Sequence, residues 1–124
     1  MCKSGIILLV LILFCACKRG NLEHIRVVQN TTVEDTIYVI NPDFDGAIDT
    51  IPPGDTAHVY RYEVLDTRQE FESCAWQGDT LIIFNQDEQY LTRSVKIEGY
   101  WDYTVRGAEE REQTCTFEIT DGDF

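Results

Sequence analysis

The sequence predicts an all-β protein, an antiparallel immunoglobulin-like β-sandwich of about seven strands. Short segments rich in β-branched and aromatic residues recur along the chain, separated by glycine, proline, asparagine and aspartate. The last segment alternates most clearly, with Cys115, Phe117 and Ile119 on one face and polar residues on the other. The helix-like stretch 108–113 is too short to be stable alone. These patterns favour two packed sheets.

Each expected strand has its own local signal. Two β-branched segments come first, and residues 41–55 are then predicted as a turn region because they hold Pro52, Pro53 and Gly54. An alternating segment, a short one carrying Cys74 and a continuous apolar run follow. The apolar run is expected to be a central strand covered on both faces. The expected strands are 25–29, 36–40, 55–64, 71–76, 81–84, 95–103 and 114–120.

The first seventeen residues form a leader of a recognisable kind. Lys3 is followed by an apolar run over 5–14, and Ala16 precedes Cys17. The segment resembles bacterial lipoprotein signal peptides. The resemblance implies that residues 1–16 are removed and that Cys17 carries the lipid. The alternative, an uncleaved membrane anchor, is disfavoured because spanning a bilayer takes about 20 apolar residues.

The lipid at Cys17 divides the chain and sets its location. Diacyl or triacyl chains, including palmitate, hold a protein stably in a membrane. Residues 17–23 are expected to be the lipidated N-terminus and tether, and 24–124 a single domain. Acidic residues after the cysteine direct Bacteroidota-type lipoproteins to the surface, but Lys18 and Arg19 stand here. We therefore expect a lipid-anchored protein of the cell envelope, in the outer membrane and facing the periplasm.

The net charge limits the classes of partner, and the cysteines indicate the redox environment. The chain has 22 acidic and 10 basic residues, a net charge of −12, which repels nucleic acid. Of the five cysteines, two leave with the leader and one is lipidated, so Cys74 and Cys115 remain. An even pair in an exported protein predicts a disulfide. A redox or metal pair is the alternative, but there is no CxxC spacing.

Turn and strand signatures over most of residues 30–124 carry a second resemblance. They are 30–32, 51–56, 79–84 and the ending 117–124. The chain resembles small uncharacterised lipoproteins of Bacteroidota with a β-sandwich domain. That resemblance implies fold and location but no activity.

Residues 41–49 imitate the start of a calcium-binding loop. Oxygen-bearing residues fall at its first, third, fifth and ninth positions, and Gly46 stands at the sixth. The twelfth position, where a bidentate glutamate belongs, is Pro52. An acidic turn exposed to solvent is the alternative, and we expect no metal and no cofactor here.

An aromatic cluster is the other candidate site. Tyr100, Trp101 and Tyr103 surround Asp102 on a predicted strand. An exposed platform of this kind can stack on a sugar ring or hold a peptide. The same residues can instead fill a sheet face.

The residues that carry reactions do not form a set in the sequence. There is no nucleophile with a base and an orienting partner, so we expect no enzyme. The expected function is a non-catalytic binding or assembly-accessory module whose partner is an unknown envelope protein or glycan. The alternative is a calcium- or glycan-binding lipoprotein that uses 41–49 or 100–103.

Overall fold

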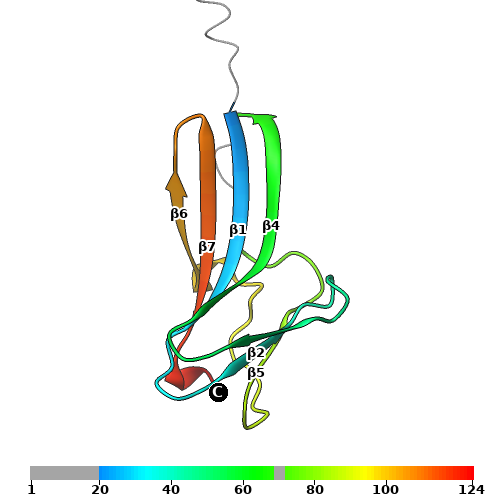
Figure 1. Ribbon diagram of the computed structural model, residues 1–124, viewed down its shortest axis with the longest axis vertical. Coiled ribbons are helices and arrows are strands. Elements are labelled where there is room, and N and C mark those ends of the chain that lie inside the picture. Colours follow the sequence, from blue (N-terminus) through cyan, green and yellow to red (C-terminus); the bar gives the residue numbers. More distant parts are fainter. Residues whose placement is uncertain (1–19, 69–71) are drawn as a thin grey trace, which may run out of the picture.

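The computed structural model describes residues 20–68 and 72–124 as a mostly β protein of two sheets (Figure 1). The all-β prediction is confirmed at this level. The first sheet has the strand order β4-β1-β7-β6 and the second the order β3-β2-β5. The strands are β1 (Gly20–Asn30), β2 (Ile37–Ile40), β3 (Ile48–Ile51), β4 (Thr56–Thr67), β5 (Ile82–Asn85), β6 (Trp101–Arg106) and β7 (Glu110–Ile119).

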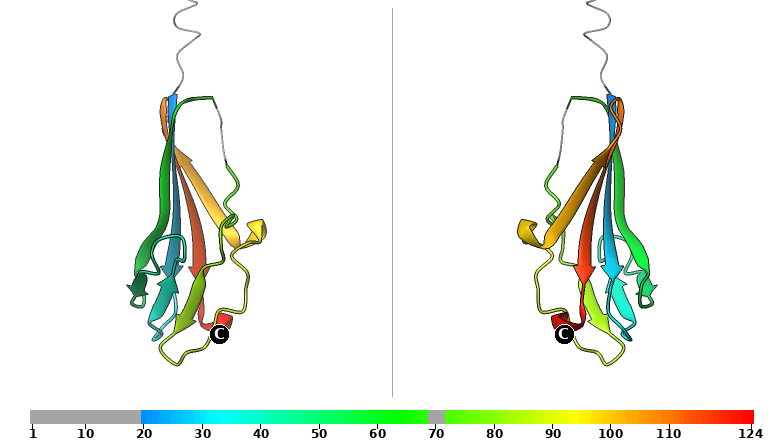
Figure 2. Two further views of the ribbon diagram at one scale, coloured as in Figure 1. Left: turned by 90° about the vertical axis from the view of Figure 1, so that its right-hand side faces the viewer. Right: turned by 90° about the vertical axis from the view of Figure 1, so that its left-hand side faces the viewer.

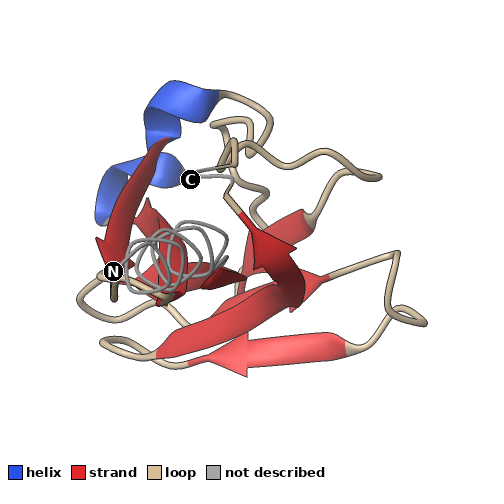
Figure 3. Ribbon diagram, turned by 90° about the horizontal axis from the view of Figure 1, so that it is seen from above, coloured by secondary structure: helices blue, strands red, loops and turns tan. Residues whose placement is uncertain are grey.

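The leader and most of the expected tether lie outside the described residues. This applies to the signal peptide 1–16, to Cys17 and to the basic residues that follow it. Among the described residues, no helix is long and apolar enough to cross a membrane. Two 3-10 helices, η1 (Glu98–Tyr100) and η2 (Asp121–Asp123), lie on the same side of the molecule (Figure 3).

The two sheets differ in length. β1, β4 and β7 are long, and the short strands β2 and β5 lie beside the end of the first sheet that is remote from Gly20 (Figures 1 and 2). β1 is a central strand that pairs antiparallel with β4 and parallel with β7. The second sheet does not cover the half of the first sheet near Gly20, and residues 72–76 pack there against Arg26 and Gln113.

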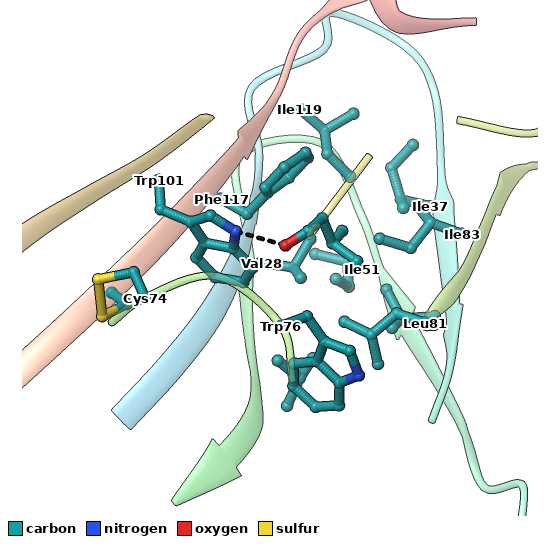
Figure 4. Close-up of a cluster of buried hydrophobic side chains, with 14 residues drawn as sticks. Val28, Ile37, Ile51, Cys74, Trp76, Leu81, Ile83, Trp101, Phe117 and Ile119 are labelled. Carbon is teal, nitrogen blue, oxygen red and sulfur yellow. Dashed lines mark hydrogen bonds between the residues drawn. A yellow bond between two sulfur atoms is a disulfide. The ribbon is translucent and has the colours of Figure 1, made fainter. Parts of the chain in front are cut away.

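The hydrophobic core lies between the sheets (Figure 4). Val28, Trp101 and Phe117 project from the first sheet, and the Trp101 and Phe117 rings meet edge to face at 5.2 Å. The indole N–H of Trp101 donates to the Val95 carbonyl at 2.8 Å, so this buried polar group is satisfied. The second sheet contributes mainly isoleucine and valine. The removal of these apolar side chains from water is what drives the two sheets together.

Three expectations about strands were wrong. The turn region 41–55 contains β3, which pairs with β2. The expected strand 71–76 is irregular over 72–76, and Phe71 lies outside the described residues. The segment 81–84 supplies most of β5, which is an edge strand and not a central one. β5 pairs with β2 along one edge. Which strands pair with a segment depends on partners elsewhere in the chain, so an apolar run alone does not identify a central strand.

Three other boundaries also moved. Residues 95–100 hold a turn and η1, so only the end of the expected strand 95–103 is extended. The helix-like stretch 108–113 instead enters β7 at Glu110, where pairing with β1 and β6 overrides local propensity. Finally, β1 begins at Gly20, and Leu22 is completely buried. Residues 20–23, expected in the tether, belong to the domain.

Candidate functional site

A buried polar row occupies the inner face of β1 where the second sheet does not reach. Side chains alternate along a strand, so Leu22, His24, Arg26 and Val28 share one face. His24 is fully buried, and Arg26 is only 5% exposed. Charged side chains are almost never this buried unless they have partners. The partners of Arg26 therefore define what this face does.

Arg26 binds the disulfide loop, the irregular segment 72–78 that carries Cys74. Its Nε donates to the Cys74 carbonyl at 2.8 Å, and Nη2 donates to the carbonyls of Ser73 at 2.9 Å and Ala75 at 3.3 Å. The guanidinium also lies 5.4 Å from the centre of the Tyr60 ring and 5.8 Å from that of Trp76. Burial lowers the pKa of Arg26, but a guanidinium remains protonated in proteins. The permanent positive charge of Arg26 thus lies close to the aromatic rings of Tyr60 and Trp76.

Glu98 of η1 binds the same loop through its donors. Its carboxylate accepts from the backbone N–H groups of Cys74 at 2.9 Å and Ala75 at 2.7 Å, and from the Ser73 hydroxyl at 2.5 Å. Burial alone would raise the pKa of Glu98. The three hydrogen bonds outweigh burial and hold the pKa below its ordinary value of 4.5. Glu98 is therefore ionised at neutral pH.

The predicted disulfide ties the loop to the sheet. Cys74 and Cys115 are bonded, with their Cα atoms 5.5 Å apart, and both are buried. Cys115 lies on β7 opposite Arg26, so the crosslink and the arginine hold adjacent points of the loop. The loop is irregular, yet it is fixed covalently and by ionic hydrogen bonds.

His24 is buried on the same face of β1 as Arg26, next to the Tyr62 ring. Its Nδ1 is 2.9 Å from the Gln113 Oε1, which also accepts the Glu72 backbone N–H, so Nδ1 is the donor. The imidazole packs 5.2 Å from the Tyr62 ring, and its Nε2 lies 4.0 Å from the Cys115 sulfur. Burial is the main reason that the pKa of His24 falls below its ordinary value of 6.5. The imidazole is therefore neutral at pH 7.

A cleft of about 510 Å³ opens above Arg26. This volume lies within the range of small-molecule sites. The residues that line it come from β1, β4, the 41–47 turn and the disulfide loop. They are Arg26, Asp43, Tyr60, Tyr62, Glu72, Ser73, Trp76, Gln77 and Gly78. A buried cation, aromatic walls and two carboxylates thus converge in one concave surface.

The expected aromatic platform does not exist as a single surface. Trp101 is 6% exposed and belongs to the core. The Tyr100 ring packs under the Arg93 guanidinium, which lies 5.1 Å from its centre. Asp102 and Tyr103 are exposed, but the alternation of β6 puts them on opposite faces. The four residues therefore do not face one ligand.

In the 41–49 loop, the first candidate calcium ligand already has protein partners. Asn41 is buried, its Nδ2 donates to the Val59 carbonyl at 3.0 Å, and its Oδ1 accepts the Asp43 backbone N–H at 3.1 Å. Within 20–68 and 72–124, no three histidine, cysteine, aspartate or glutamate side chains are grouped to hold a metal. The loop instead presents Asp43 to the cleft.

The sequence alone did not identify Arg26, Glu98 or the aromatic residues of the cleft, which are Tyr60, Tyr62 and Trp76. One signal was present: a single arginine stands inside the β-branched segment 25–29. A charge at an inward position of a central strand needs a built environment. Comparison of the chain with protein-family models, with curated proteins and with solved structures found no match.

Proposed function

We propose that this protein is a non-catalytic binding module of the bacterial cell envelope, held to the membrane by a lipid on Cys17, with the Arg26 cleft as its ligand site. The observation that carries the proposal is the buried Arg26 at the base of an aromatic cleft. Such a charge is costly to bury, and the disulfide loop is fixed around it. A rigid, concave, charged surface suits recognition.

The start of β1 supports a close membrane tether. Gly20 is three residues after Cys17 and already belongs to the sheet. Three extended residues span about 10 Å. The end of the first sheet near Gly20 would therefore lie next to the lipid headgroups. We place the module at the outer membrane, facing the periplasm, as the residues after Cys17 favour.

The architecture proposed is an immunoglobulin-like sandwich. The first and last strands, β1 and β7, pair in parallel next to a disulfide, and tryptophans lie in the core. These features support that assignment. Sandwiches of this kind present binding surfaces more often through scaffolded loops than through their core strands. The disulfide loop fills that role here.

The partners of the polar groups near the cleft support the proposed non-catalytic assignment. The Ser73 hydroxyl donates to Glu98, whose lowered pKa makes it a weak base. His24 is buried against the disulfide sulfur and is bonded to Gln113. Neither residue supplies a base beside an accessible nucleophile. Turnover of a peptide, ester or glycan by the protein, lost with a single acidic substitution, would overturn this assignment.

The test of the binding site is a nuclear magnetic resonance titration of the chain lacking residues 1–16 and carrying Cys17→Ser. Envelope fragments serve as probes: short peptides, neutral sugars and sugar acids. The expected result is shifted backbone resonances at Arg26, Tyr60 and 72–78. Shifts confined to 100–103 on addition of the sugars, or to 45–49 on addition of calcium chloride, would favour the glycan- or calcium-binding alternative. Absence of any shift at the cleft would contradict the proposal.

A further inference from the structure

The charges of the cleft point to the class of ligand. We propose that the Arg26 cleft binds a zwitterion, with the ligand carboxylate on Arg26 and its ammonium group beside Asp43 and Glu72. A free amino acid or a short peptide with both termini free has this chemistry. The inference rests on the proposed function, because it names what the same cleft recognises.

The carboxylate is assigned to the guanidinium nitrogen of Arg26 for which the described residues provide no acceptor. Nε and Nη2 of Arg26 donate to three carbonyls, whereas Nη1 has no partner among the described residues. In the same residues, no fully buried side-chain nitrogen or oxygen lacks a hydrogen bond. Nη1 must therefore reach solvent, and the cleft is the surface that Arg26 lines. A carboxylate is a natural partner for such a donor.

The ammonium group is assigned to the two carboxylates of the cleft. Glu72 lies close enough for its charge to stabilise the charged form of Arg26, yet no ion pair within 4.0 Å joins them in the described residues. The Asp43 carboxylate lies over Gly78, since a Cβ added there would clash with it. Arg26, Asp43 and Glu72 thus line one cleft, and within the described residues no ion pair joins Arg26 to either acid. A ligand with both charges can lie between them and satisfy all three.

The same acids disfavour a purely anionic ligand. Nη1 offers charge for a single anionic group, and Asp43 and Glu72 would repel a phosphate dianion in the same space. The net charge of −12 adds to that repulsion at long range. A zwitterion carries no net charge and escapes this penalty. The charge balance of the cleft therefore selects against phosphates and acidic sugars.

Aromatic side chains supply the apolar part of the site. Tyr60 lies 5.3 Å from Tyr62 and 5.9 Å from Trp76, ring centre to ring centre, with all three lining the cleft. Tyr60 and Tyr62 are partly exposed and present ring surface to the opening. Such surfaces favour an apolar or aromatic ligand side chain. Alanyl-phenylalanine is thus a suitable probe.

The experiment compares three forms of that probe by calorimetry: free, amidated at the C-terminus and acetylated at the N-terminus. Each blocked form is expected to bind at least about tenfold more weakly, because each loses a charged hydrogen bond. Free phenylalanine distinguishes an amino-acid site from a peptide site. In the guanidinium nitrogen spectrum, the Arg26 signals should shift with the free and acetylated peptides and not with the amidated one.

Conservative variants assign the ammonium group. Asp43→Asn and Glu72→Gln should weaken the free dipeptide toward the affinity of the acetylated form. Neither variant should weaken the acetylated form, which is an anion and loses only repulsion. Asp45→Asn is the matched control from the same loop, outside the cleft, and should change neither affinity. Equal binding of the free and blocked peptides at the cleft would overturn the zwitterion and leave the binding function standing. Failure of every probe at the cleft would contradict the binding function itself.

Discussion

Arg26 and Glu98 bind the same three residues through opposite groups. Arg26 donates to the carbonyls of Ser73, Cys74 and Ala75, and Glu98 accepts the Cys74 and Ala75 amides and the Ser73 hydroxyl. An arginine and a glutamate on different elements thereby bind the backbone of an irregular segment. Charged hydrogen bonds are the stronger kind, and here they replace a β-ladder.

The first prediction concerns Glu98→Gln. It should lower the free energy of unfolding by about 1 kcal/mol, since an amide replaces a charged acceptor for three donors at an exposed position. Because the folded pKa of Glu98 is lowered, its contribution is present above pH 4.5 and is lost as the pH falls further. Urea unfolding measures the change, with Asp102→Asn as the exposed control. Equal stability of both variants would show that Glu98 does not fix the loop.

The second prediction concerns the disulfide. Replacing Cys74 and Cys115 together by alanine should lower the free energy of unfolding by about 4 kcal/mol, because the crosslink closes a loop with a sequence separation of 41. Denaturant unfolding of the double variant gives the value. Thiol titration of the unreduced wild type should find both cysteines blocked. Two free thiols in the folded protein would refute the disulfide.

The third prediction is a pH dependence from His24. Burial is the main cause that lowers the pKa of His24 in the folded protein. As the pH falls, the imidazole therefore takes up a proton in the unfolded chain before it does so in the folded one. Stability is therefore complete above about pH 6.5 and falls as the pH drops below that value. His24→Leu should remove this part of the slope, while Gln113 keeps its bond to the Glu72 amide. An unchanged slope between pH 6.5 and 5 would exclude His24 as its source.

The fourth prediction concerns the membrane anchor. Cys17→Ser should yield a precursor that is neither acylated nor cut after Ala16, because the thiol is the group that takes the lipid. Mass spectrometry and labelling with a palmitate analogue check this, and Cys15→Ser is the control that should be processed normally. Normal processing of the Cys17→Ser chain would defeat the lipoprotein assignment.

The fold class and the disulfide could be predicted because their signals are local or compositional. Alternation at Cys115, Phe117 and Ile119 matches β7, and the cysteine count leaves one pair. Strand β3 was not predicted because turn residues flank it and because it forms by pairing with β2, about ten residues away. The loop 72–76 shows strand-like composition, yet Arg26 and Glu98 take its backbone groups. In both cases the partner of the segment, and not its own composition, decides the structure.

The cleft could not be predicted because its parts come from four separate segments. Arg26, Asp43, Tyr60 and Trp76 lie on β1, the turn between β2 and β3, β4 and the disulfide loop, respectively. No spacing rule connects them, and each alone is typical of a strand or a turn. The aromatic run 100–103 was conspicuous in the sequence, but consecutive residues on a strand face opposite ways. A site assembled by tertiary structure needs the register of β1 with β4.

The most direct test of the account is to measure intermolecular nuclear Overhauser effects between alanyl-phenylalanine and the protein. We expect contacts from the phenylalanine ring protons to the ring protons of Tyr60, Tyr62 and Trp76, and a shift of the Arg26 guanidinium signals in the same complex. Contacts to Tyr100 or Tyr103 in place of these, or a bound peptide that leaves Arg26 unshifted, would contradict it.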